Sequence, residues 1–230
     1  MSKKNKKEEA IGLDVTLNKS EAFIEKHFKK ILLCIAAIAV VFAAIYIYRG
    51  HRASVETEAQ TAMAKSQRAF QMDQFEQALN GDGAMEKGFI KIIDEYSGTA
   101  TANLAKYYAG ICYYNLGKID EAISMLEDFD QQDDALISPA SFAALGDCYV
   151  AKGDKQKGVE LFEKAAKESD SRAEGGVNNS QSPQFLLKAA KIYEDLNQND
   201  KALELYKKIK SDYASQLSVE MDKYIERLSK

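Results

Sequence analysis

Three segments of the chain, residues 107–129, 142–165 and 186–209, align with one another and limit the fold more than any other feature. In each, a small residue precedes a tyrosine by three positions, a turn with Gly or Asn follows, and a second small residue stands four positions before a large one. A unit of two short helices cannot bury its own apolar face, so such units must stack on one another. The first small residues are Gly110, Gly146 and Ala190, the turn residues are Gly117, Gly153 and Asn197, and the second small residues are Ala122, Gly158 and Ala202.

This order of residues resembles the tetratricopeptide repeat (TPR), whose pattern is L-G-x-x-Y, a turn, and A-x-x-x-F. The first interval between equivalent small residues is 36 positions, near the roughly 34 of that family, and the second is 44 because a polar segment, residues 169–182, is inserted. The chain departs from the pattern at Lys106 and Phe129 and has no Trp. The resemblance implies an all-α fold with a TPR-type right-handed α-solenoid, and a weaker repeat in register over residues 69–102.

The two prolines agree with a chain that is helical almost throughout, since average usage would give about eleven in 230 residues. Both follow a serine, as Ser138-Pro139 and Ser182-Pro183. Proline is tolerated at the first helical position, where its missing amide hydrogen is not needed. We therefore predict that each serine is an N-cap and that each proline begins the first helix of a repeat.

Residues 31–48, ILLCIAAIAVVFAAIYIY, contain no charged side chain. As a helix they would span about 27 Å, against roughly 30 Å for the hydrocarbon core of a bilayer. The alternatives are a buried core helix, which rarely lacks a polar face over this length, and a cleaved signal peptide, for which no A-x-A site follows the run. The sequence therefore predicts a single N-terminal transmembrane helix.

Charge differs on the two sides of this apolar run. Residues 1–52 hold ten Lys and Arg against five Asp and Glu, whereas the rest of the chain holds 21 against 30. Because lysines gather before the run, the positive-inside bias predicts a cytoplasmic N-terminus and an exported body. The acidic body argues against nucleic acid as a partner, since phosphate binding needs a concentrated Lys and Arg face.

Five regions are expected along the chain. Upstream of the repeats, residues 54–80 lack Gly and Pro and predict one continuous helix, and residues 89–96 predict a second that ends at Ser97-Gly98. The expected regions are a basic tail over residues 1–30, the transmembrane helix over 31–48, a long helix plus degenerate first repeat over 49–102, three repeats over 103–214 with the insert at 169–182, and a capping helix over 215–230.

The sequence holds no catalytic pattern. His27 and His51, the only histidines, flank the apolar run, and no zinc, P-loop or nucleophile-elbow motif occurs. Cys112 and Cys148 occupy equivalent positions about 8–10 Å apart, beyond the reach of a relaxed disulfide, and are interpreted as small core residues. The acidic run at residues 128–134 lacks the glycine and terminal Glu of an EF-hand and is interpreted as an inter-repeat turn. We therefore expect no enzyme activity, cofactor or metal.

The TPR resemblance implies a concave groove, lined by the first helix of each repeat, that holds segments of other proteins. One end of this groove is aromatic and apolar, and the other is charged. For Tyr107 and Tyr114, binding a partner and packing on the preceding repeat both remain open, since first-helix aromatic residues serve both purposes. The implied groove residues are Leu104, Tyr107, Ile111, Tyr114, Asn115, Ala140, Ala143, Asp147, Val150, Leu187, Lys191 and Glu194.

The layout of the whole chain is similar to that of the YfgM family, ancillary subunits of the bacterial Sec translocon. It has a Lys-rich tail ending EAFIEKHFKK, one span ending IYIYRGHR, an Ala- and Gln-rich helix and degenerate repeats. The resemblance implies a single-pass inner-membrane protein with a periplasmic TPR domain. Its partners would be the translocon channel, a membrane-anchored prolyl isomerase-like chaperone and unfolded polypeptide clients. The alternative is a structural TPR scaffold of another envelope assembly, such as a secretion or motility machine.

Overall fold

The computed structural model describes the backbone of residues 3–83 and 86–229, and the side chains of these ranges from residue 26 onward. Over the described residues the regular elements are helices, with one isolated bridge between Gly81 and Lys87. The chain divides into two units, Met1–Ser54 and Val55–Lys230, and each is described by itself. Most lysines of the predicted basic tail lie before residue 26, so their side chains fall outside the described residues.

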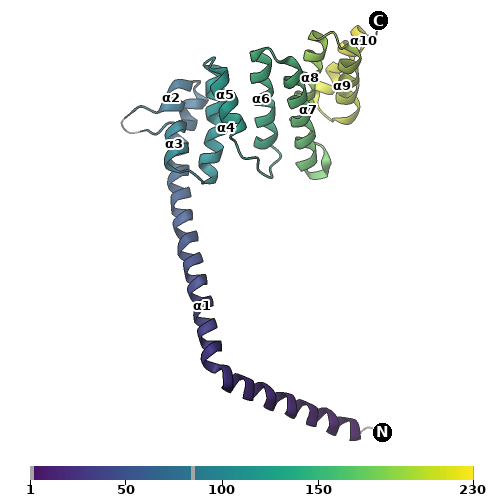
Figure 1. Cartoon of the computed structure of the whole chain (residues 1–230). Coiled ribbons are helices and arrows are strands. Elements are labelled where there is room, and N and C mark those ends of the chain that lie inside the picture. The colour runs from purple at the N-terminus through teal and green to yellow at the C-terminus, as the bar shows by residue number, and fades with distance from the viewer. Residues whose placement is uncertain (1–2, 84–85, 230) are drawn as a thin grey trace. The chain divides into compact units, whose positions relative to one another are not determined.

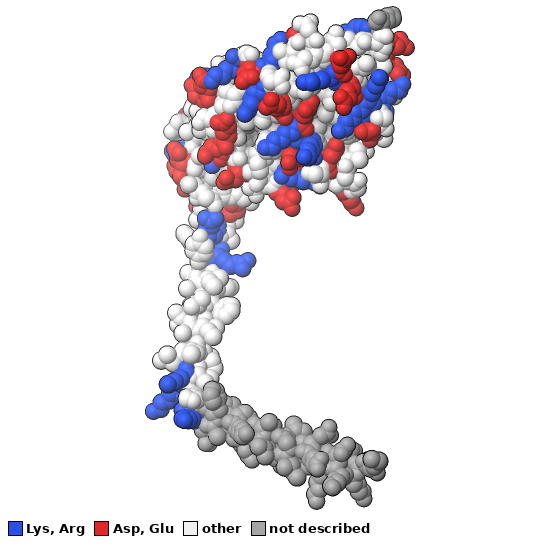
Figure 2. All heavy atoms as spheres, turned by 45° about the vertical axis from the view of Figure 1, so that its right-hand side comes forward, with Lys and Arg blue, Asp and Glu red and all other residues white. Residues whose placement is uncertain are grey.

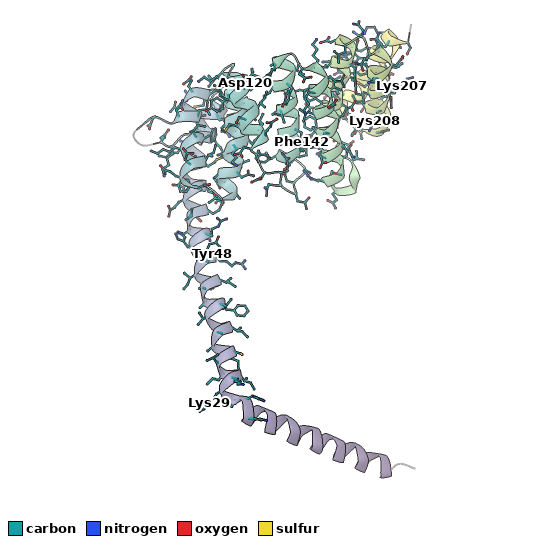
Figure 3. The ribbon with its side chains drawn as sticks, in the orientation of Figure 1. Lys29, Tyr48, Asp120, Phe142, Lys207 and Lys208 are labelled. Atoms are coloured by element: carbon teal, nitrogen blue, oxygen red, sulfur yellow. The ribbon has the colours of Figure 1, made fainter. Side chains whose placement is uncertain are left out.

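The first unit contains most of α1 (Lys3–Gln71), which runs without interruption through the predicted span. Its described part, Lys26–Gln71, is long and apolar enough to cross a membrane. Large apolar side chains in it face outward, such as Leu33, Val40 and Ile47, which are 72%, 68% and 70% exposed. This exposure does not fit a buried core helix, and it is what a lipid-facing helix requires. Figure 2 shows an uncharged stretch of this helix between basic side chains at both ends, and Figure 3 labels Lys29 and Tyr48 near its limits.

The second unit is a row of antiparallel helix pairs, in which each helix packs on the next along the chain (Figure 1). Three apolar clusters lie along the row, and the partly buried side chains of Tyr113 and Phe142 each pack against two of them. The elements that follow α1 are α2 (Phe75–Asn80), α3 (Phe89–Glu95), α4 (Ala100–Asn115), α5 (Ile119–Glu127), α6 (Ile137–Lys152), α7 (Lys155–Arg172), η1 (Glu174–Gly176), α8 (Ser182–Asp195), α9 (Asn199–Asp212) and α10 (Gln216–Leu228).

The turns inside the three repeats have the left-handed backbone that their residues allow. Gly117, Gly153 and Asn197 have φ of 73°, 97° and 57°, as the sequence predicts. After each turn the second helix begins, and small residues of both helices lie where the two helices meet. At Gly110 in α4, for example, a Cβ would come within 2.6 Å of Leu126 Cγ in α5. The small residues therefore set how closely the two helices of a repeat approach.

The prediction of one helix over residues 54–80 is wrong, because the chain reverses between α1 and α2. Asp73 has φ of 56°, and Gln74 N donates to Ala69 O at 2.9 Å, which ends α1. The reversal brings the Phe75 ring edge-on to Phe70, with 5.9 Å between their centroids. Packing of two aromatic rings thus overrides the helical propensity of the segment.

The prediction that Ser138 and Ser182 are N-caps is also wrong. Residue Asp134 caps α6, since its carboxylate accepts from Leu136 N at 2.8 Å and from Ser138 N at 3.1 Å. Asn178 plays the same part before α8, where its Oδ1 accepts from Ser180 N and Gln181 N at 3.0 and 3.1 Å. Asp and Asn side chains can each satisfy several amides at a helix start, so the serines lie inside the first turn.

The inserted segment, residues 169–182, is built into the row of helices. Its first residues extend α7 to Arg172, and the rest bridges the repeats on either side. Asn178 Nδ2 donates to Ala135 O, in the loop before α6, at 3.2 Å. Asn179 Oδ1 accepts from Ala214 N, between α9 and α10, at 2.7 Å. The insert therefore links the start of the second repeat to the end of the third along one edge.

Each end of the second unit is held by its own local contact. At its start, the Glu56 carboxylate of α1 accepts from Ala100 N at 2.9 Å and from Thr101 N at 3.1 Å at the first turn of α4. Partial burial acts to raise the pKa of Glu56, but these bonds and that from the Thr101 hydroxyl outweigh it and lower the pKa. At the other end, α10 covers α9, with Tyr224 stacked on Tyr206 at 4.8 Å.

Candidate functional site

A recess of about 300 Å³ lies among α4, α6 and α8, the first helices of the three repeats. Its floor is formed by the small side chains of α6, namely Ala140, Ala143 and Ala144. Small residues on the middle helix leave a hollow between the longer side chains of the two outer helices. The walls of the recess carry Tyr107, Ile111, Tyr114 and Asn115 from α4 and Phe185 and Lys188 from α8, while Leu126 and Asp147 complete the lining.

The two tyrosines of the recess differ in their burial and in the residues that they contact. Tyr107 packs on the Phe129 ring at 6.0 Å, and burial raises its pKa to about 12, with the neighbouring Tyr108 and Asp134 adding to the effect. Tyr114 is 37% exposed, and its pKa is raised chiefly by partial burial. Among the described residues neither hydroxyl has a hydrogen-bond partner. Tyr107 therefore supports the recess by packing, and Tyr114 offers an open aromatic surface.

An ion pair lies across the recess. Lys188 Nζ of α8 is 2.6 Å from Asp147 Oδ2 of α6, and the two side chains are 47% and 32% exposed. The same ammonium lies 5.3 Å from the ring centroid of Phe162, a buried residue of α7. Partly exposed pairs of this kind contribute little to stability, about 0–1 kcal/mol, and can exchange partners readily.

The residues that the sequence predicted for the groove divide into two sets. Of the twelve residues that the resemblance implied for the groove, Ala140, Ala143 and five others line the recess. Leu104, Val150 and Leu187 are instead half-buried against apolar clusters, and Lys191 is exposed outside the recess. The Glu194 carboxylate accepts from Tyr206 of α9 and Arg227 of α10. The five that line the recess are Tyr107, Ile111, Tyr114, Asn115 and Asp147.

Sequence reasoning missed four residues of the recess, Leu126, Ala144, Phe185 and Lys188. The insert gives the last repeat an interval of 44 residues, which relates Lys188 to Ala144 and Lys191 to Asp147. Repeat register alone therefore offers both lysines and does not single out Lys188.

The other titratable groups singled out in the sequence have structural surroundings. Cys112 and Cys148 are buried and free, and burial raises the pKa of each thiol to about 12, which disfavours the nucleophilic thiolate. Within the acidic loop, Asp128 pairs with Lys106 at 2.7 Å, and Asp134 caps α6. Over the described part of the chain, no group of three or more His, Cys, Asp or Glu side chains is placed to hold a metal ion.

Known proteins share this repeat pattern and this fold. Two family models, both described as tetratricopeptide repeat, match the chain, one over residues 104–133 and 184–215 and the other over residues 139–171. The chain is similar to a crystal structure of nearly identical TPR-like repeats from a Podosopora anserina protein assigned as a kinesin light chain. The identity is 15%, the TM-score is 0.59, and 75% of this chain and 86% of that chain are covered.

A single-substitution variant of the same protein gives 15% identity and a TM-score of 0.58, over 75% of this chain and 85% of the other. No curated protein matches the chain. At this identity the solved structures show the fold alone.

Each of the three repeats predicted from the sequence lies within one matched segment and is confirmed. The chain therefore contains TPR repeats in a TPR-like α-solenoid, together with one long apolar N-terminal helix that is a candidate membrane anchor. Repeats of this kind make the chain a scaffold for protein–protein interaction, a class that is typically non-catalytic.

Proposed function

We propose that this chain is a membrane-anchored ancillary subunit of a bacterial protein translocon, which binds emerging or unfolded polypeptides in the recess among α4, α6 and α8. The observation that carries the proposal is an apolar recess in which the partly exposed Tyr114 hydroxyl has no hydrogen-bond partner among the described residues. A passing polypeptide supplies both apolar side chains and backbone carbonyl groups, and these suit the two features of the recess.

The small size of the recess supports transient binding of many sequences. A volume of about 300 Å³ lies at the lower limit for ligand pockets, so it accommodates about one large side chain. Such an anchor gives weak affinity, which lets a client leave and fold. Tethering by the apolar helix offsets the weak affinity, because it raises the effective concentration of the repeats for any partner in the same membrane.

The topology in this proposal follows from the charge bias of the sequence. The basic tail, residues 1–30, is cytoplasmic, residues 31–48 span the inner membrane, and the body from residue 49 onward is periplasmic. Residues 49–102 then form the entry to the row of repeats, residues 103–214 present the groove, and residues 215–230 close its end. The partners are the translocon channel and a membrane-anchored prolyl isomerase-like chaperone, as the YfgM resemblance implies.

Copurification from native membranes after mild crosslinking tests this proposal. We expect translocon subunits among the recovered proteins. Recovery of a fixed secretion or motility complex without translocon subunits would instead make the chain a structural scaffold of that complex.

The groove itself is tested with a double variant, Tyr107→Ala and Tyr114→Ala, which should reduce the yield of crosslinked client polypeptides. Tyr149→Ala is the matched control, since Tyr149 is a half-buried first-helix tyrosine that does not line the recess. Client capture that is unchanged in the double variant, with the protein still folded, contradicts the groove assignment.

A further inference from the structure

Polar side chains also line the recess, and they restrict which groups a ligand can have next to the apolar side chain that it inserts. Asn115 Nδ2 donates to Ile111 O at 2.8 Å, and its Oδ1 accepts no hydrogen bond among the described residues. The Asp147 carboxylate uses Oδ2 for Lys188, and its Oδ1 makes no hydrogen bond among the described residues. Both open atoms are acceptors, so this end of the recess favours a donor from the ligand.

The charge of the whole unit points the same way. Residues from Val55 onward hold 21 Lys and Arg against 30 Asp and Glu. A segment with a positive charge is attracted to such a surface, and one with a negative charge is repelled. Among cationic side chains, the planar guanidinium of arginine can engage a carboxylate through two hydrogen bonds, whereas the lysine ammonium acts as a point charge.

We propose that the recess selects polypeptide segments in which one large apolar side chain is followed closely by an arginine, and that Asp147 is the partner of that arginine. The apolar side chain lies over the alanine floor beside Tyr114, and the guanidinium takes the place of the Lys188 ammonium on Asp147. The inference rests on the proposed function, because it names the ligand of the same recess.

In this arrangement Lys188 is an internal competitor for the acidic site. It holds Asp147 when the recess is empty and releases it when a suitable segment arrives. The exchange keeps the number of ion pairs constant, so it costs little, and it disfavours segments that bring no cation of their own. Lys188 and Asp147 are thus specificity-determining residues on the rim, and the tyrosine wall supplies the apolar contact.

Fluorescence anisotropy with the full chain in detergent tests this inference, using two labelled unstructured peptides of 12 residues or so. Both carry a central Leu, followed two positions later by Arg in one peptide and by Glu in the other. We expect the Arg peptide to bind about threefold to fivefold more tightly, the range of a partly exposed ion pair. Asp147→Asn should abolish the preference, and Lys188→Met should increase it, because it frees Asp147.

The opposite signs separate binding from structure. Both substitutions break the same link between α6 and α8, so a merely structural role predicts that both weaken binding. Lys191→Met is the matched control, since Lys191 is an exposed lysine of α8 that does not line the recess. Thermal unfolding followed by circular dichroism shows that each variant is folded.

Equal binding of the two peptides, or a lower preference in Lys188→Met, overturns the inference. If the two peptides bind equally and both lose binding in Tyr114→Ala, the proposed function stands and only the preference for arginine fails. If neither peptide depends on Tyr114, the proposed function fails as well.

Discussion

The close approach of helices inside a repeat can be tested at Gly110, where helix propensity and packing predict opposite results. Replacing glycine by alanine inside an exposed helix stabilises it by about 1 kcal/mol. At Gly110, however, the new Cβ would lie 2.6 Å from Leu126 Cγ and 2.9 Å from its Cδ2, and Leu126 is only 3% exposed. Overpacking of a buried site typically costs about 1–3 kcal/mol, so the expected net loss for Gly110→Ala is about 1 kcal/mol.

A graded series makes this prediction sharper. Gly110→Val adds two more methyl groups and loses the propensity gain of alanine, so we expect a loss of about 3 kcal/mol. For a unit of this size, thermal unfolding followed by circular dichroism should register about 3 °C per kcal/mol. Gly50→Ala is the control, because a Cβ at Gly50 meets nothing within 4 Å. A Gly110→Ala protein as stable as the wild type, or more stable, would refute the packing of α4 on α5 described above.

Three further predictions concern single contacts. Hydrogen bonds keep the folded-state pKa of Glu56 below its unfolded value. The stabilisation that ionised Glu56 gives the fold is therefore present at neutral pH and is lost as the pH falls through the folded pKa. Glu56→Gln should therefore lower stability by about 1 kcal/mol at pH 7 and leave it less sensitive to acid, as urea unfolding at pH 7 and pH 4 can measure. Asn178→Ala removes the cap of α8 and the link to Ala135, and we expect a loss of about 1–2 kcal/mol in urea unfolding, with Asn179→Ala smaller. In a Cys34→Ser background, alkylation of the two buried thiols at pH 8 should be slow until urea unfolds the chain, and rapid labelling without urea would contradict their burial.

Much of the fold could be predicted because local sequence patterns determine it. Small residues such as Gly146, and turn residues such as Gly153, recur at fixed offsets, and each has a physical role within one pair of helices. The apolar run is equally local, since a helix without a polar face has few environments open to it. These features need no knowledge of what lies elsewhere in the chain.

The parts that sequence reasoning missed depend on contacts between distant residues. The reversal at Asp73 follows from packing of Phe70 against Phe75 and Phe89, which no local propensity reveals. The cap at Asp134 was missed because its carboxylate accepts from amides two to four residues further along the chain. The sequence pattern instead predicts the serine directly before the proline as the cap. Propensity and capping rules describe neighbours, and tertiary contacts decided both cases.

The candidate site shows the same limit. Groove positions carried over from the TPR pattern identified the α4 wall, where register is unambiguous. They failed on α8, because the hollow follows the alanines of α6 and there reaches Phe185 and Lys188, which are not at the positions that the pattern implies. The resulting ion pair of Lys188 and Asp147 joins residues 41 positions apart and has no signature in either helix alone.

Binding of polypeptides in the recess among α4, α6 and α8 can be measured by photocrosslinking in cells that are exporting protein. A photoreactive amino acid at position 114 is compared with one at Lys207, an exposed residue of α9 outside the recess (Figure 3). We expect adducts with exported polypeptides at position 114 and few at position 207. Adducts that are absent at position 114, or equally abundant at both positions, would contradict binding in the recess.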